Sequence, residues 1–302
     1  MEAVKTIDIV IVAYEKELNQ LDLLLKSIVR YFNFSSLGEI FVITQEDGDR
    51  YKLFLESKYR NFPIDIEFHT QEFLLGHVAY KSGWHLQQII KLLAYKLVAT
   101  DFYLVLDTKN FFVNNVDIND FLFNGKALYK RFTERNHIGL TMGEYFVKSY
   151  ATFELDASSY LDKSMGPLTP FVFKRSLVED MVKFLLEKFS KNSFTTVFME
   201  DVKGSEFYLY CAYCHRFRYF ENFHAPRNNT LFSSTLFQGH VEDGNYFNNA
   251  IEAIVDGRTK ISGINKTAFA VLDIKKKSTL SNVLSEFLSS DELNAYFNFS
   301  LN

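Results

Sequence analysis

The residues best suited to chemistry follow a short apolar segment near the middle of the chain. Phe102 to Leu106 is an apolar run typical of a strand, and it ends at Asp107, which Lys109 follows two positions later. A carboxylate at the end of a buried strand can coordinate a divalent cation or accept hydrogen bonds from ribose or sugar hydroxyls. Many such aspartates only cap the turn that follows. The role of Asp107 therefore depends on its neighbours.

A second polar set recurs at helical spacing before this strand. We expect a helix from about Gly83 to Ala99, with Ser82 as its N-cap. One side of this helix is apolar, and the other carries Trp84, Gln87, Gln88, Lys91 and Tyr95. The amides suit a base or a sugar and the lysine suits a phosphate. The alternative is an exposed face with the tryptophan packed beneath a loop.

Glu206 is the candidate general base. It follows Gly204 and Ser205 at an expected helix start, where backbone N–H groups stabilise a carboxylate. The alternative is a first-turn glutamate that only caps the helix, in the manner of a capping box. Glu200-Asp201 and Asp156 are second choices for the same role.

Composition excludes several classes of protein. The net charge is −4, which gives no support for nucleic-acid binding. No apolar run approaches the ~20 residues of a membrane helix, and the first residues lack the features of a signal peptide. We therefore expect a cytoplasmic protein without a transmembrane segment, with a peripheral position at the inner membrane face as the alternative. Cys211 and Cys214 could form a zinc site with His215 and His224, but two buried free thiols are the favoured interpretation.

The first half of the chain alternates strand-like and helical segments. The expected strands are Ile7–Tyr14, Glu39–Thr44, Ile64–Phe68 and Phe102–Leu106, and the expected helices are Leu21–Tyr31 and 83–99. The order β-α-β-β-α-β predicts an α/β fold with an open, mostly parallel sheet flanked by helices. Because ligands bind at the carboxyl ends of such strands, we expect Ala13, Tyr14, Gln45 and Asp107 to converge there.

The second half is less regular. We expect a strand at Phe171–Phe173, helices at Leu177–Phe189 and Glu206–Cys214, and a strand-like segment from Arg216 to Phe223. The tail, Ser281 to Phe297, is amphipathic and helical, and its polar face is acidic. An acidic face disfavours anionic lipids, so packing onto the domain or onto a second subunit is the better fit.

The strand that ends at Asp107 resembles the corresponding strand of GT-A-type glycosyltransferases, which ends in Asp-x-Asp. The chain is also similar to a little-characterised group of bacterial glycosyltransferase-like proteins. The resemblance spans roughly Ile7 to Tyr213 and depends on four segments in the right order. These are Gly83-Trp84-His85-Leu86-Gln87-Gln88-Ile89-Ile90-Lys91-Leu92, Leu106-Asp107 with Phe112, Thr169-Pro170-Phe171-Val172-Phe173, and Ser205-Glu206-Phe207-Tyr208-Leu209-Tyr210.

The chain departs from the Asp-x-Asp pattern at Lys109, because a lysine repels a divalent cation. Three interpretations stay open. Lys109 replaces the metal as the positive charge that faces the donor phosphate, or the site is degenerate and the protein only binds, or Lys109 points to solvent. We favour the first, which implies no metal cofactor and a donor with one phosphate, such as a CMP-sugar. The alternative is an Mn²⁺ or Mg²⁺ enzyme with Asp107 and His240 as ligands, because late histidines in GT-A enzymes often touch the metal.

The resemblance implies a glycosyltransferase that moves a sugar from a nucleotide-sugar to a hydroxyl of a glycan or lipid-linked glycan, such as capsule or lipopolysaccharide. Glu206 and Asp107 would be the catalytic residues. The donor site would comprise Ala13, Tyr14, Trp84, Gln87, Gln88, Lys91, Asp107, Lys109 and His240. We expect one GT-A-like domain, with a donor half (1–143), an acceptor half (144–275) and a helical tail (276–302), that can form homo-oligomers. A catalytically inactive binding or scaffold subunit is the alternative.

Overall fold

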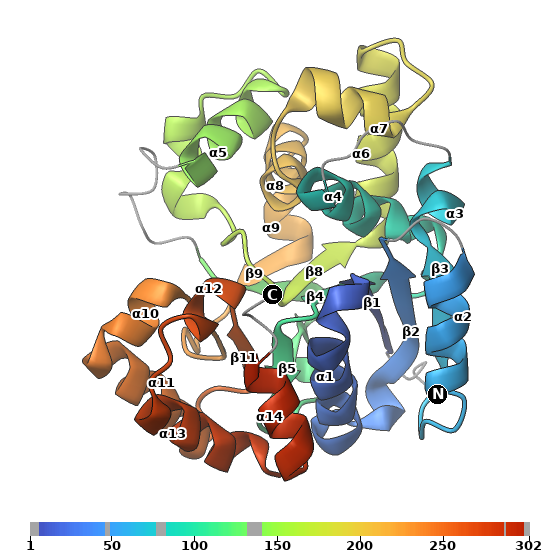
Figure 1. The fold of residues 1–302 in the computed structure, drawn as a ribbon. Helices are drawn as coiled ribbons and strands as arrows, with labels where there is room; N and C mark the ends of the chain where they lie inside the picture. The colour runs from blue at the N-terminus through green and yellow to red at the C-terminus, as the bar shows by residue number, and fades with distance from the viewer. Residues whose placement is uncertain (1–5, 46–48, 77–82, 132–140, 287, 299–302) are drawn as a thin grey trace.

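The structure is a computed structural model that describes residues 6–45, 49–76, 83–131, 141–286 and 288–298 (Figure 1). The expected N-cap Ser82 lies outside these residues. Among the described residues, no helix is both long enough and apolar enough to span a membrane.

A five-stranded sheet with the order β3-β2-β1-β4-β8 forms the centre of the fold. Its strands are β1 (Ile7–Ala13), β2 (Leu37–Thr44), β3 (Ile66–Thr70), β4 (Phe102–Asp107) and β8 (Phe171–Lys174). The first four are parallel, and β8 pairs antiparallel with β4. The prediction of an open, mostly parallel sheet flanked by helices is therefore confirmed.

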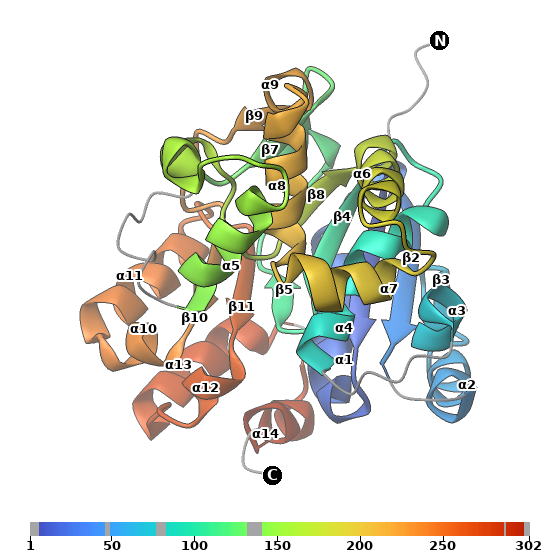
Figure 2. The same cartoon turned by 90° about the horizontal axis from the view of Figure 1, so that it is seen from above.

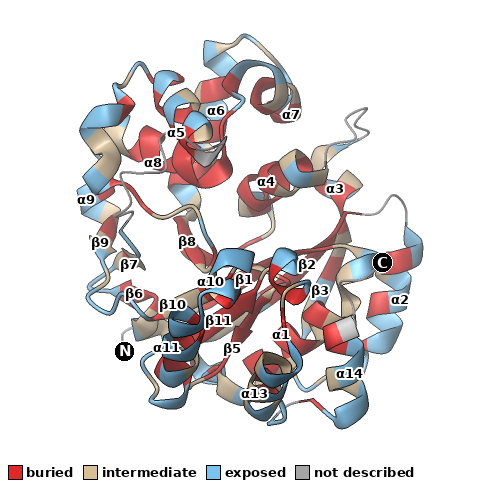
Figure 3. Ribbon diagram, turned by 60° about the vertical axis from the view of Figure 1, so that its left-hand side comes forward, coloured by how far each residue is buried: buried red, intermediate tan, exposed pale blue. Residues whose placement is uncertain are grey.

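The two faces of this sheet follow from the alternation of side chains along each strand. In β1, Val10 and Val12 belong to one buried cluster, whereas Ile9 and Ile11 belong to another on the opposite face. Figure 3 shows the strands as a buried layer between helices. The helices that contribute residues to these two clusters are α1 (Leu18–Tyr31), α2 (Asp49–Lys58), α3 (Gln71–Leu75), α4 (Gly83–Leu93), α5 (Thr141–Ala151), α6 (Arg175–Lys188), α7 (Phe194–Thr196), α8 (Glu206–Arg216) and α9 (Phe220–Phe223).

A second sheet, with the order β10-β11-β5, carries the C-terminal helices (Figure 2). Its strands are β5 (Asn110–Phe112), β10 (Ser233–Leu236) and β11 (Ile261–Ile264). Its helices are α10 (Gln238–Glu242), α11 (Gly244–Val255), α12 (Lys266–Phe269), α13 (Ile274–Leu284) and α14 (Ser290–Asn298), and with the sheet they enclose a third buried cluster. A small third sheet joins β6 (Leu122–Phe123), β7 (Lys126–Tyr129) and β9 (His224–Pro226).

The tail packs onto α1 of the same chain. It forms two helices, α13 and α14, where one amphipathic helix was expected. Glu292 forms an ion pair with Lys26 of α1, and the hydroxyl of Tyr31 donates a hydrogen bond to Glu286 at 2.5 Å. The acidic face of the tail therefore contacts groups of its own chain.

Two sequence-based assignments are wrong. The segment between β2 and β3 contains the helix α2, which was missed because few of its side chains are apolar and buried; they include Tyr51 and Leu55. Arg216 to Phe223 is the end of α8, a turn and the helix α9 rather than a strand. A short aromatic segment is compatible with a helix and with a strand, so the spacing of its apolar residues does not distinguish the two.

Asp8 joins three parts of the central sheet. Its carboxylate accepts hydrogen bonds from the backbone N–H groups of Glu39 at 3.0 Å, Ala99 at 2.8 Å and Thr100 at 3.0 Å. A β-carbon on Gly38 would lie 2.1 Å from Asp8 Oδ1, so this close approach requires a glycine. The buried carboxylate therefore fixes the start of β1 against β2 and against the turn before β4.

We predict that Asp8→Ala lowers the free energy of unfolding by about 3 kcal/mol, because backbone donors lose a charged acceptor in a buried place. Denaturant unfolding followed by circular dichroism measures this change. Asp65→Ala, at an exposed aspartate, is the matched control and should change stability by less than about 0.5 kcal/mol. Equal effects of the two substitutions would contradict a structural role for Asp8.

Candidate functional site

The carboxyl ends of the parallel strands meet at one edge of the central sheet. Val12 of β1 pairs with Asp107 of β4, and Ala13 pairs with Thr44 of β2. The N–H group of Gln45 donates to the carbonyl of Ala13 at 3.1 Å. The expected convergence of these residues at the strand ends is thus confirmed.

The start of α4 lies against the same edge. The side chain of Gln45 donates a hydrogen bond to the carbonyl of Gly83 at 3.0 Å. A β-carbon on Gly83 would lie 2.5 Å from the hydroxyl oxygen of Tyr14, so the Tyr14 side chain lies close against the start of α4. The helix therefore begins at the ends of β1 and β2.

Lys91 of α4 lies between two carboxylates. Its Nζ lies 2.7 Å from Oδ1 of Asp107 at the end of β4 and 3.3 Å from Oε1 of Glu206 at the start of α8. Lys109 forms an ion pair with the second oxygen of Asp107. We call these four residues the Lys91 cluster. Glu206 and Lys91 are separated by 115 positions in sequence, and the fold places them in contact.

Gln88, one helical turn before Lys91, fixes the start of α8. Its Oε1 accepts a hydrogen bond from the N–H of Glu206 at 3.2 Å, and its Nε2 donates to the carbonyl of Trp84 at 3.3 Å. Ser205 occupies the expected N-cap position, but its side chain makes no capping hydrogen bond. A first-turn donor of α8 is therefore satisfied by a side chain of α4.

A close approach of α5 positions the segment before α8. The hydroxyl oxygen of Ser149 accepts a hydrogen bond from the N–H of Ser205 at 3.2 Å. A β-carbon on Gly204 would lie 2.3 Å from that same oxygen. Gly204 is therefore needed for the contact that places Glu206 opposite Lys91.

Burial and charge shift the pKa values of the cluster in different directions. Burial acts to raise the pKa of Asp107, but Lys109 and Lys91 outweigh it and hold that pKa well below its ordinary range. Burial alone would lower the pKa of Lys91, and the two carboxylates reverse this and raise it. Burial raises the pKa of Glu206 although Lys91 acts against the rise. Of the two carboxyl groups of the cluster, Glu206 is thus the one that takes up a proton at the higher pH.

Further contacts hold Asp107 and the turn that follows it. The hydroxyl of Thr169, in the segment before β8, donates to Oδ2 of Asp107 at 3.0 Å. The Asp107 N–H donates to Oδ1 of Asn110 at 2.9 Å, which stabilises the turn. The carbonyl of Lys109 accepts from the N–H of Ile264 in β11 at 3.2 Å. The turn at 107–109 is therefore held by both sheets.

Sequence reasoning missed Glu17, which lies beside this turn. Its carboxylate accepts hydrogen bonds from the hydroxyl of Thr108 at 2.8 Å and from the N–H of Tyr14 at 3.4 Å. Burial raises the pKa of Glu17, and Asp107 adds to this rise. The sequence gives little indication of a role for Glu17, because charged residues commonly follow the end of a strand. No sequence pattern predicts its hydrogen bond with Thr108.

Trp84 and Gln87 lie on α4 but outside the ion pairs. Gln87 is half-buried, whereas Trp84 is 42% exposed and its ring packs against Tyr145 of α5. The polar stripe of this helix is therefore largely internal: Gln88 and Lys91 are buried and face α8.

The structure places His240 in the C-terminal part, on α10. Its Nδ1 lies 3.0 Å from the carbonyl of Thr235, and its ring stacks on Tyr246 at 4.1 Å. Within the described part of the chain, no hydrogen bond or ion pair joins His240 to Asp107. His240 is thus not brought into the Lys91 cluster.

The alternative bases and the cysteines also lie apart from the cluster. Glu200 and Asp201 form ion pairs with Lys191, and Asp156 caps a short 3₁₀ helix. Cys211 and Cys214 are buried as free thiols, and burial raises the pKa of Cys211 to about 12. Nearby, Nε2 of His224 forms a hydrogen bond with the hydroxyl of Tyr210 at 2.9 Å.

The side chains around Asp107 do not suit the binding of a divalent cation. Both carboxylate oxygens already face ammonium groups, and those charges would repel a metal ion. Among the described residues, no three His, Cys, Asp or Glu side chains gather closely enough to hold a metal. The Lys91 cluster therefore supplies positive charge through lysines.

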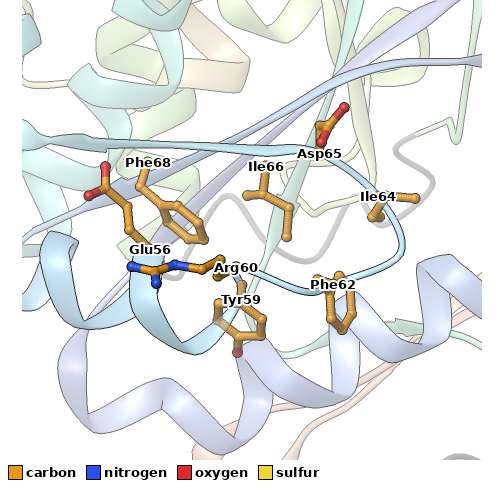
Figure 4. Close-up of a pocket in the computed structure, with 8 residues that line it drawn as sticks. All are labelled: Glu56, Tyr59, Arg60, Phe62, Ile64, Asp65, Ile66 and Phe68. Atoms are coloured by element: carbon orange, nitrogen blue, oxygen red, sulfur yellow. The ribbon is translucent and has the colours of Figure 1, made fainter.

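Two hollows lie away from this edge of the sheet. Figure 4 shows one of about 150 Å³ between α2 and β3, which is small for a nucleotide-sugar because ligand pockets commonly measure about 300–1,000 Å³. It is lined by Glu56, Tyr59, Arg60, Phe62, Ile64, Asp65, Ile66 and Phe68. The second, of about 320 Å³, lies at the far end of α1, next to Tyr31 and Lys260. Neither includes a residue of the Lys91 cluster.

The sheet order, the flanking helices and the polar turn after β4 define a GT-A-like fold. The chain belongs to the family of unknown function DUF6492, whose model matches residues 2–299. No curated protein matches the sequence.

Comparison with solved structures shows the same fold. The chain is similar to the apo structure of the bifunctional glycosyltransferase WbbM, with a TM-score of 0.54 and 11% identity over 98% of this chain and 52% of that one. The chain thus spans about half of WbbM. Weaker matches are GlyE of Streptococcus pneumoniae TIGR4 (TM-score 0.46, 13% identity, 98% of this chain and 64% of that one) and mouse xyloside xylosyltransferase 1 (0.48, 11%, 85% and 97%).

We predict that Asp107→Asn lowers the free energy of unfolding by about 3 kcal/mol at pH 7, because Lys91 and Lys109 lose their shared counter-charge. The pKa of Asp107 is lower in the folded protein, so its carboxylate stabilises the fold above the unfolded pKa of about 3.9. That contribution declines as the pH falls toward the folded pKa.

The difference in free energy of unfolding between wild type and Asp107→Asn should therefore be largest above about pH 5 and become smaller below about pH 4. Urea unfolding at a series of pH values measures it. The matched control is Asp180→Asn, at an exposed position on α6. A difference in free energy of unfolding that grows as the pH falls would show that the Asp107 carboxylate does not stabilise the fold by compensating the charges of Lys91 and Lys109.

Proposed function

We propose that the protein is a metal-independent glycosyltransferase that moves a sugar from a nucleotide-sugar donor to a hydroxyl group of a glycan. The observation that carries the proposal is that both oxygens of Asp107 face lysine ammonium groups at the edge of the sheet where α/β folds bind ligands. The GT-A-like fold is consistent with this chemistry and does not by itself establish it.

Charge balance favours a donor with a single phosphate. The cluster sets two ammonium groups against two carboxylates, so its charges balance while Glu206 is ionised, as a general base must be. A phosphodiester such as that of a CMP-sugar adds one negative charge, and the proton that Glu206 takes from the acceptor offsets it. Lys109, at the more accessible side of Asp107, is the group that would meet the phosphate.

In the proposed reaction, the acceptor oxygen attacks the anomeric carbon and the bond from that carbon to the phosphate oxygen breaks. Glu206 takes the proton of the acceptor hydroxyl, and the departing nucleotide keeps the electron pair of the broken bond. The raised pKa of Glu206 makes its carboxylate a stronger base than that of an ordinary glutamate, and Lys109 offsets the charge that develops on the leaving phosphate. Gln88 and Lys91 hold Glu206 in place.

The donor site would comprise Ala13, Tyr14, Gln87, Gln88, Lys91, Asp107 and Lys109, and we add Glu17 because it contacts the same turn. For the acceptor we propose a hydroxyl of a bacterial surface polysaccharide or lipopolysaccharide, free or lipid-linked. A cytoplasmic protein would reach such an acceptor during its synthesis.

A catalytically inactive binding subunit is the second candidate. The observation that favours it is the burial of the cluster, because Lys91 and Glu206 are 3% and 4% exposed. Their charges already compensate each other inside the protein. Buried ion pairs can be purely structural. Nucleotide binding without turnover would favour this candidate.

We predict that CMP raises the melting temperature with or without Mn²⁺, because a ligand that binds only the folded state stabilises it. A thermal-shift screen of CMP, UDP, GDP and ADP measures this. The shift should disappear in Lys109→Ala and persist in Lys275→Ala, at an exposed lysine. A shift that requires Mn²⁺ with UDP or GDP would instead support a metal-dependent enzyme and reject the proposed role of Lys109.

We predict that Glu206→Gln slows sugar release by about 10²–10⁴-fold without loss of the nucleotide-induced thermal shift, because only the proton acceptor is removed. Hydrolysis of the nucleotide-sugar that matches the stabilising nucleotide provides the assay. Glu187→Gln, at an exposed glutamate, should leave the rate unchanged. Equal rates for wild type and Glu206→Gln would exclude Glu206 as the base.

A further inference from the structure

Trp84 is exposed although it is large and aromatic. It is the single tryptophan of the sequence, and 42% of its surface is accessible. Its ring centroid lies 4.9 Å from that of Tyr145 of α5 and 4.8 Å from that of His85. Trp84 and Tyr145, which we call the aromatic platform, therefore present ring surface to solvent from two different helices.

The platform is attached to the Lys91 cluster by one buried side chain. Gln88 is 1% exposed, and its amide connects the carbonyl of Trp84 with the N–H of Glu206 at 3.3 and 3.2 Å. The backbone of Trp84 is thus held relative to the backbone of Glu206. An exposed tryptophan held in this way is fixed in position without being covered.

The positions along α4 define a path from the buried cluster to solvent. Trp84, Gln88 and Lys91 share one face of the helix because they are spaced by four and three residues. Seven residues of helix span about 10 Å. Lys91 and Gln88 are buried and Trp84 is exposed, so the platform lies where this face of the helix emerges.

We infer that Trp84 and Tyr145 form the acceptor subsite, on which a pyranose ring of the glycan stacks with its hydroxyl directed toward Glu206. The inference rests on the proposed function. The C–H face of a pyranose ring is apolar, and it packs against an aromatic face as other apolar groups do. The occupant is the acceptor because the attachment runs to Glu206, which receives the acceptor proton, whereas the phosphate-binding Lys109 lies on the other side of Asp107.

The charge around the platform also fits a neutral sugar. Burial lowers the pKa of His85, which keeps its ring uncharged at neutral pH. On α5, Lys148 forms an ion pair with Glu144, so neither supplies a free charge. An uncharged aromatic surface binds a sugar ring better than a phosphate. This assignment moves Trp84 from the donor site, where the sequence pattern placed it, to the acceptor site.

Trp84 fluorescence reports on the platform directly, because no second tryptophan contributes. Wild type and Trp84→Ala are first compared on a microarray of bacterial and synthetic oligosaccharides. Each bound oligosaccharide is then titrated in solution, as are CMP, UDP and GDP. We expect bound oligosaccharides to change the emission of Trp84, and Trp84→Ala to weaken their binding about tenfold.

Matched variants separate stacking from loss of structure. Trp84→Phe and Tyr145→Phe keep a ring and should retain most of the affinity, whereas Tyr145→Ala should lose it in part. Thermal melting of each variant checks the fold. The nucleotide-induced thermal shift should be unchanged in Trp84→Ala, because the donor site does not include the platform.

Three results would overturn the inference. They are equal oligosaccharide binding by wild type and Trp84→Ala, binding of nucleotide but of no oligosaccharide, and a change of Trp84 emission with nucleotide alone. The last result would assign the ring to the donor base. Failure of the proposed function is recognised separately, because it removes the nucleotide-induced shift in wild type as well.

Discussion

The ammonium group of Lys91 lies almost out of reach of water, and the site depends on how its charge is balanced. A buried charge without a partner costs several kcal/mol, so the fold must bring carboxylates to it. Asp107 comes from the end of β4 and Glu206 from the start of α8. The ring of Phe207 adds a cation–π contact, with its centroid 5.3 Å from Nζ. One lysine thus fixes the relative positions of a strand and two helices.

The surrounding charges also give the two carboxyl groups of the cluster different pKa values. Asp107 faces two lysines and stays ionised, whereas Glu206 faces one, is more deeply buried and has a raised pKa. Two acidic groups in one cluster thus acquire different properties from their surroundings. A permanent carboxylate holds the lysines, and the other is free to exchange a proton.

The sequence was most informative where a structure depends on local pattern. The apolar runs of β1, β2 and β4 predicted the sheet, and parallel order predicted that Ala13, Gln45 and Asp107 meet at one edge. The contact of Lys91 with Glu206 could not be predicted, because it depends on long-range packing rather than on spacing. A phosphate contact was expected of Lys91 without its carboxylate partners, which the three-dimensional fold reveals.

The turn from β4 to β5 joins the central sheet to the second sheet, β10-β11-β5. Its carbonyl at Lys109 bonds to Ile264, and a β-carbon on Gly263 would lie 3.2 Å from that same oxygen. The C-terminal helices look in Figure 2 like an appendage beside the central sheet, yet β11 shapes the turn that carries Lys109. Shortening or exchanging this part of the chain would therefore alter the turn that carries Lys109.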